Sequence, residues 1–147
     1  YNKIVVDAKI LVKYRNSKKG FFWISKSSLG SRNNLSIELY FEKASIKWSQ
    51  EDFENIYISH KNGNVVKIDR SVNSNILNEA RYNRYRMGHP AGFIEAFANI
   101  YQDIASDFSN NKNDYTFNHI NGFEIIKILD NCIVSSLKQK WIKNSSI

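Results

Sequence analysis

Alternation of hydrophobic and polar residues dominates the first half of the chain. Every second residue is apolar through most of residues 3–15, and the same period returns at 35–41 and 44–48. This period is typical of strands with one buried face. Further strands are expected at 21–27, 55–60 and 65–69, and Asn62–Gly63 between the last two favours a tight hairpin turn. The pattern predicts six strands in consecutive antiparallel hairpins.

Helical spacing replaces this alternation in the second half. Apolar residues recur every three or four positions up to Phe108, and Pro90 suits the first position of that helix. A second helix is expected from Asn121 to Gln139, with Asn121 and Glu124 as its capping pair. We expect both apolar stripes to lie in the core. Residues 71–88 form a long polar loop, the segment expected to carry functional contacts.

These patterns predict an α+β fold: an open antiparallel sheet of about six strands, with two long C-terminal helices packed on one face. The 147 residues, 42% of them hydrophobic, suit one globular domain. No apolar run approaches the ~20 residues that span a bilayer, and no signal peptide is visible. We therefore expect a soluble protein with no membrane partner.

The net charge of +7 raises the question of nucleic-acid binding. The lysines, however, are scattered through the expected strands and turns. The only cluster interleaves Arg81, Arg84 and Arg86 with Tyr82 and Tyr85. The distribution favours a solvated basic surface, and an RNA-binding module is the weaker alternative.

For several kinds of catalytic or binding site the sequence contains no candidate residues. The six glycines form neither a dinucleotide-binding fingerprint nor a phosphate-binding loop. The three histidines lie far apart without cysteine or carboxylate partners at ligand spacing, so no metal site is predicted. Cys132 stands among apolar residues and is expected to be a buried, reduced thiol. We predict no catalytic residue in this chain, and no cofactor bound by the chain alone.

Three sequence blocks extend this interpretation. They are SRNNLSIELY at 31–40, KASIKWSQE at 43–51 and GHPAGFIEAFAN at 88–99. In order and spacing they resemble the C-terminal half of the glucose-fructose oxidoreductase, inositol dehydrogenase and MocA (Gfo/Idh/MocA) family. Residues 121–142 are similar to the closing helix and short terminal strand of that family. The resemblance therefore covers nearly the whole chain.

The resemblance implies that residues 1–147 are a C-terminal substrate and oligomerisation domain, without the N-terminal Rossmann domain of family members. It implies a cytoplasmic oxidoreductase that oxidises a sugar or cyclitol hydroxyl with NAD or NADP as cofactor. The 147-residue chain alone is expected to be inactive. The implied partners are a Rossmann domain, a sugar-like substrate and further copies of the chain. The alternative is a non-catalytic dimerisation or binding domain, or a remnant of such an enzyme.

Five residues are candidates for substrate contact. His89 either caps the following helix or binds substrate. Tyr85 and Arg86 lie in the loop where contacts are expected. Arg32 and Asn34 flank a strand entrance, where turn formation competes with binding of sugar hydroxyls.

One face of the expected sheet carries more aromatic surface than a solvated face normally leaves open. Depending on the register, it displays Leu11, Phe21, Trp23, Tyr40 and Tyr57. The family that the chain resembles pairs such open faces. We therefore predict a homo-oligomer formed through the sheet. The alternative is that the Rossmann half of the family or the loop at 71–88 covers these positions.

Overall fold

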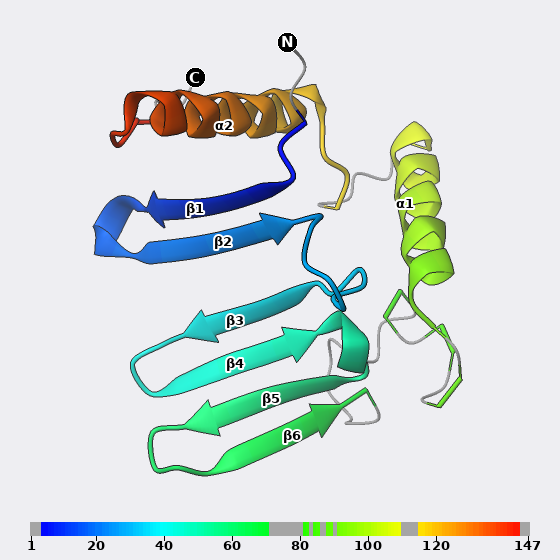
Figure 1. Ribbon diagram of the computed structural model, residues 1–147. Helices are drawn as coiled ribbons and strands as arrows, with labels where there is room; N and C mark the ends of the chain where they lie inside the picture. Colours follow the sequence, from blue (N-terminus) through cyan, green and yellow to red (C-terminus); the bar gives the residue numbers. More distant parts are fainter. Residues whose placement is uncertain are drawn as a thin grey trace. The chain divides into compact units, whose positions relative to one another are not determined.

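The computed structural model describes residues 4–70, 81–82, 84–85, 88–89, 91–109 and 115–144 (Figure 1). The chain divides into two compact units. The first unit is formed by Tyr1–Gly30 and Phe117–Ile147, and the second by Ser31–Thr116.

The first unit contains a two-stranded hairpin of β1 (Asp7–Lys13) and β2 (Lys19–Ser25). The strands pair antiparallel, with Leu11 opposite Phe21. A short 3-10 turn, η1 (Arg15–Ser17), joins them, and Asn16 adopts a left-handed φ of 67° there. Asparagine tolerates this conformation better than most residues, which explains the reversal without a glycine at that position.

The same unit contains α2 (His119–Lys138). The side chain of Asn118 caps this helix, since its Oδ1 accepts hydrogen bonds from the amides of Ile120 at 2.9 Å and Asn121 at 3.1 Å. Asn121 reciprocates, because its Oδ1 accepts from the Asn118 amide at 3.0 Å. The predicted capping pair of Asn121 and Glu124 is therefore wrong, and the helix begins two residues earlier than expected.

Replacing Asn118 with alanine is expected to lower the free energy of unfolding by about 1 kcal/mol, since two helix amides lose their acceptor. Urea titration followed by circular dichroism measures this difference. Asn33→Ala is the control, because the exposed Asn33 side chain makes no hydrogen bond within the described part of the chain. Equal stability of the two variants would contradict the assignment of the cap.

The second unit contains a four-stranded antiparallel sheet in the order β3-β4-β5-β6. Its strands are β3 (Ser36–Tyr40), β4 (Ala44–Ser49), β5 (Asn55–His60) and β6 (Val65–Asp69). A 3-10 turn, η2 (Gln50–Asp52), precedes β5. The predicted bounds of β5 and β6 are confirmed, and Gly63 in the turn between them has a φ of 88°.

The register separates the two faces of this sheet by polarity. Because side chains alternate along a strand, opposed residues share a face. One face carries Ile37, Leu39, Ile46, Trp48, Ile56, Ile58, Val66 and Ile68. The other carries a row of charged and aromatic side chains, namely Glu38, Lys47, Tyr57 and Lys67.

Helix α1 (Phe93–Phe108) also belongs to the second unit. Gly92 is its N-cap and has a φ of 138°, a conformation that side chains rarely adopt. The first turn is closed from within the helix, because the Gly92 amide donates to Glu95 Oε2 at 2.6 Å. The helix therefore begins at Phe93. Pro90, the predicted first helical residue, lies outside the described residues.

The described residues form six strands and two helices, which confirms the predicted α+β class, but these strands form two sheets rather than one. The reason lies in the hydrogen bonding: β1 pairs only with β2, while β3 begins a separate four-stranded ladder. The linker predicted at 109–114 lies outside the described residues except for Ser109, the C-cap of α1.

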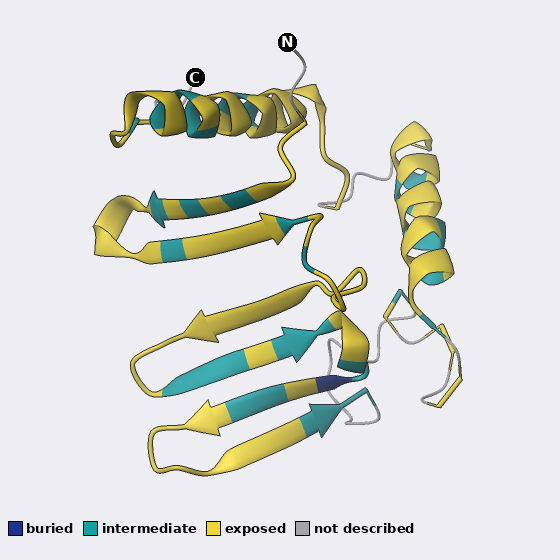
Figure 2. Cartoon of the chain, viewed as in Figure 1, coloured by how far each residue is buried: buried dark blue, intermediate teal, exposed yellow. Residues whose placement is uncertain are grey.

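The predicted core is not formed by the described residues (Figure 2). None of their hydrophobic side chains is buried, and Phe93 and Phe123 on the two helical stripes are 79% and 55% exposed. Cys132, expected to be buried, is a free cysteine of intermediate exposure. An amphipathic stripe becomes core only where another surface covers it. Within the described residues, side chains on both helical stripes stay largely exposed.

Neither helix in the described part of the chain is long and apolar enough to cross a membrane.

Candidate functional site

A cluster of polar side chains attaches the segment around Arg81 to α1. The Arg81 guanidinium donates two parallel hydrogen bonds to the Asp103 carboxylate, Nη1 to Oδ1 and Nη2 to Oδ2, both at 2.9 Å. The two side chains are only 19% and 13% exposed. Bidentate pairing with little solvent access makes this a stronger contact than an ordinary surface ion pair.

Neighbouring groups complete the attachment. The Arg81 guanidinium lies over the Tyr115 ring, 3.7 Å from its centroid. Asn99 Nδ2 donates to the Arg81 carbonyl at 2.9 Å, and its Oδ1 accepts from Arg84 Nη2 at the same distance. Because Asn99 and Asp103 are four residues apart on α1, they lie on one face of the helix. That face holds both the backbone and the side chain of Arg81.

The pairing shifts the pKa values of both partners away from their ordinary values. The hydrogen bond from Arg81 lowers the pKa of Asp103, and the hydrogen bond to Asp103 raises the pKa of Arg81. The stabilisation from Asp103 is complete above its unfolded pKa and is lost as the pH falls through its lowered folded pKa. At neutral pH the pair is fully ionised.

Two predicted site residues follow in the same segment. Tyr85 is 48% exposed, and His89 is exposed just after Gly88, whose φ of 84° suits glycine. Gly92 occupies the N-cap position of α1, and the two roles expected of His89, capping of helix amides or contact with substrate, stay predictions. Arg86, the third candidate in this loop, lies outside the described residues.

The other two predicted site residues stand at the entrance to β3. Asn34 Oδ1 accepts from the Ser49 hydroxyl at 3.4 Å, which joins the entrance of β3 to the end of β4. The Arg32 carbonyl accepts from the Asn34 amide at 2.5 Å, as expected of a tight turn. The Arg32 side chain is exposed and makes no hydrogen bond or ion pair among the described residues. These contacts support turn formation by Asn34.

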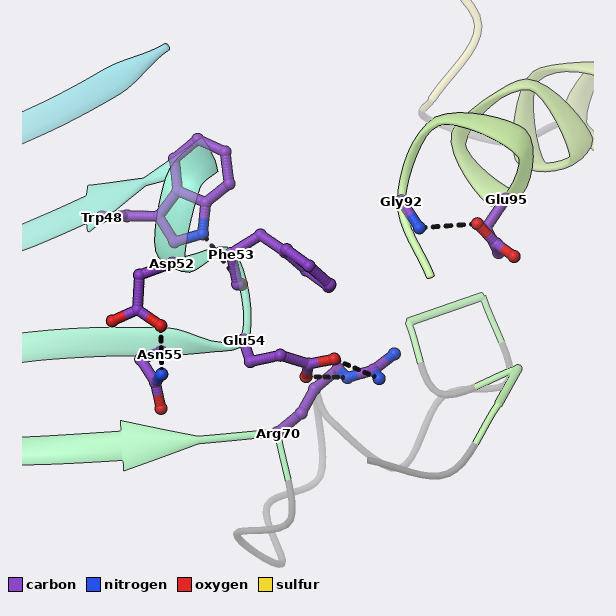
Figure 3. Close-up of polar contacts among 8 residues, drawn as sticks. All are labelled: Trp48, Asp52, Phe53, Glu54, Asn55, Arg70, Gly92 and Glu95. Atoms are coloured by element: carbon purple, nitrogen blue, oxygen red, sulfur yellow. Dashed lines mark hydrogen bonds and ion pairs between the residues drawn. The ribbon is translucent and has the colours of Figure 1, made fainter. Parts of the chain in front are cut away.

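A second polar cluster fastens the turn before β5 (Figure 3). Arg70 and Glu54 form another bidentate pair, with Nε–Oε2 at 2.6 Å and Nη2–Oε1 at 2.7 Å. Trp48 Nε1 donates to the Phe53 carbonyl at 3.1 Å. These contacts tie the ends of β4, β5 and β6 together, and we interpret them as structural.

Asp52 is the hub of a smaller network in the same place. Its carboxylate accepts from the Asn55 side-chain amide and, at 2.7 Å, from the Tyr57 hydroxyl. The hydrogen bond with Tyr57 lowers the pKa of Asp52 and raises that of Tyr57. Asn55 is the one buried side chain in the described part, and its Oδ1 has no hydrogen-bond partner.

The contacts of Arg81 were not predicted from the sequence, although Arg81 was noted within its cluster. The missing partners are Asn99 and Asp103 on the polar side of α1, and Tyr115 beyond the end of that helix. The available signal was an amide and a carboxylate four positions apart on the polar side of a predicted helix, following a loop rich in arginine. Within the described ranges no group of three or more His, Cys, Asp or Glu side chains could hold a metal ion.

Comparison with known protein families identifies the domain. Residues 3–143 match the family described as "Oxidoreductase family, C-terminal alpha/beta domain", the Gfo/Idh/MocA family. The chain belongs to this family, as its sequence blocks predicted. A comparison with curated proteins gives no match.

Solved structures agree with this assignment. An oxidoreductase from Sinorhizobium meliloti is 25% identical with a TM-score of 0.75, over 92% of this chain and 40% of that one. An inositol dehydrogenase homolog from Azotobacter vinelandii complexed with NAD+ is 26% identical with a TM-score of 0.57, over 67% of this chain and 25% of that one. The same homolog is also known with NADH and myo-inositol. The chain thus spans two fifths or less of these proteins.

Proposed function

We propose that this chain is the substrate-side domain of an NAD- or NADP-dependent oxidoreductase that acts on a hydroxyl of a sugar or cyclitol. The observation that carries the proposal is the likeness, across 67% of the chain, to an inositol dehydrogenase homolog complexed with NADH and myo-inositol. In such a reaction a hydride passes from the substrate carbon to the nicotinamide. A Rossmann domain outside residues 1–147 would hold the cofactor. In this proposal the enzyme acts in the cytoplasm.

In this proposal Tyr85 and His89 contact the substrate. Both are exposed, both carry groups that hydrogen-bond to hydroxyls, and the cluster around Arg81 anchors the segment before them. Asn34 stabilises the turn at the start of β3 in this proposal and does not contact the substrate. We assign no catalytic residue to this chain, because the hydride passes between the substrate and the nicotinamide.

The proposal includes self-association through an open sheet face. On the β1–β2 hairpin Leu11, Phe21 and Trp23 share one face and are 64%, 61% and 59% exposed. Tyr40 on β3 is 77% exposed, whereas Tyr57 is half-buried beside Asp52 and departs from the predicted set. Burying such aromatic side chains against a second copy would supply the driving force.

The test is a turnover assay of the complete gene product that contains residues 1–147. NAD+ and NADP+ are each offered with a panel of cyclitols, aldoses and sugar acids, and formation of the reduced nicotinamide is followed by absorbance. We expect turnover of at least one cyclitol or sugar with one of the two cofactors. Absence of turnover across the panel would contradict the proposed activity and favour a non-catalytic binding domain.

A further inference from the structure

The polar face of the four-stranded sheet presents its side chains in two rows that cross all four strands. From β3 to β6, the first row reads Glu38, Lys47, Tyr57 and Lys67. The second row reads Tyr40, Ser45, Ser59 and Val65 in the same direction. The order of these residues, and not only their composition, decides what this face can pair with.

Side chains of the first row are accessible and held in place. Glu38 and Lys47 form an ion pair at 3.0 Å, with side chains that are 41% and 59% exposed. The Tyr40 hydroxyl donates to Glu38 Oε2 at 2.5 Å, and all of β3 is exposed (Figure 2). Lys67 is exposed too, with Nζ 5.9 Å from the centroid of the Tyr57 ring. Because these contacts already order the side chains, a partner that binds them pays a smaller entropic cost.

The first row is complementary to its own reverse. A twofold axis parallel to the strands, between two stacked sheets, lays β3 over the partner's β6 and β4 over the partner's β5. Glu38 then meets the partner's Lys67, and Lys47 meets the partner's Tyr57 ring, each pair occurring twice. The first pair joins opposite charges, and the second places an ammonium group on an aromatic ring. Packed sheets lie about 10 Å apart, a gap that a glutamate and a lysine bridge from its two sides.

The other in-plane arrangement of two copies is unfavourable. A twofold axis perpendicular to the strands and centred on the first row lays each strand over its own copy. Glu38 then faces the partner's Glu38, and Lys47 faces the partner's Lys47. Like charges placed opposite each other disfavour a contact. The row therefore selects one orientation of a second copy.

We propose that the polar face of the β3–β6 sheet is a twofold interface with a second copy of the chain, in which Glu38 pairs with the partner's Lys67 and Lys47 with the partner's Tyr57. This rests on the self-association included in the proposed function, and it specifies the face and the orientation. The Asp52 carboxylate, bound to the Tyr57 hydroxyl, supplies a second acidic group beside the two lysines. The mixed charges of the row fit a second copy better than a strongly anionic or cationic partner.

The test measures the dimer dissociation constant of the complete gene product by sedimentation over a concentration series. Glu38→Lys and Lys67→Glu each place like charges at both symmetry-related contacts, so each should raise the constant at least about tenfold. An equimolar mixture of the two variants should associate nearly as tightly as the wild type. In that mixture one chain has lysine and the other glutamate at both positions, which restores opposite charges at both contacts. Mixing cannot repair a defect that lies within either chain.

Glu42→Lys and Lys61→Glu are the matched controls. They make the same two charge changes at exposed positions in the turns that join β3 to β4 and β5 to β6. Alone and mixed, they should associate as the wild type does. If a reversed variant fails to fold by circular dichroism, Lys67→Gln replaces it. This variant removes one charge and should still raise the dissociation constant several-fold.

Wild-type association by Glu38→Lys and Lys67→Glu would overturn the proposal, because another surface would then form the contact. A mixture that associates no more tightly than either variant alone would also overturn it, as would a monomeric wild type. The turnover assay separates this interface from the proposed activity. Turnover by a monomeric wild type would refute the interface alone, whereas recovery on mixing without turnover would refute the activity alone.

Discussion

The 147-residue chain on its own is expected to show no saturable binding of NADH or NADPH. Nucleotide phosphates are held by closely spaced glycines at the start of a helix, where backbone amides converge on the anion. The glycines of this chain stand at 20, 30, 63, 88, 92 and 122, and no such spacing exists among them. Calorimetric titration with each nucleotide measures the affinity. Saturable binding at micromolar concentration would mean that the chain has a cofactor site of a different kind.

The second large effect is expected from Trp23→Lys, which should shift the self-associated chain toward monomer. Trp23 is 59% exposed on the open face of the β1–β2 hairpin. A buried aromatic side chain removes roughly 150–250 Å² from water, so replacing it with a charge should weaken association by well over tenfold. Light scattering over a concentration series measures the change, and the helical circular dichroism signal should persist.

Leu29→Lys is the control for this substitution. Leu29 is fully exposed and lies outside β1 and β2, so the variant makes the same charge change away from the hairpin face. It should associate as the wild type does. A wild-type chain that stays monomeric at high concentration would contradict the assignment of the face, as would an unchanged assembly of Trp23→Lys.

The strands were predictable because their period is local. The bounds of β5 and β6 agree with prediction, since Asn62–Gly63 defines the turn and therefore the register on both sides. The split into two sheets was not predictable, because alternation shows that a strand has two faces but not which strand lies beside it. The helix starts were misplaced for a similar reason. Proline and an Asn–Glu pair are plausible signals, while Gly92 and Asn118 occupy the cap positions in the structure.

The candidate site was predictable only in outline. The Arg- and Tyr-rich loop stood out in the sequence, and Tyr85 and His89 lie in its described part. The partners of Arg81 did not stand out, because Asp103 and Asn99 look like ordinary solvent-facing positions of an amphipathic helix. Asp103 and Asn99 acquire their role only because Arg81 contacts them from a distant part of the sequence. No local sequence pattern encodes such a contact. The apolar stripes were interpreted as core because helical periodicity identifies a hydrophobic face. Periodicity does not identify the surface against which that face packs.

The central proposal is that residues 1–147 belong to an NAD- or NADP-dependent oxidoreductase whose cofactor site lies outside them. Titration of the complete gene product with NADH and NADPH, followed by quenching of tryptophan fluorescence, tests this claim most directly when the 147-residue chain is titrated alongside. The account predicts saturable binding of one nucleotide by the complete product and none by the chain alone. Failure of the complete product to bind either nucleotide would contradict it.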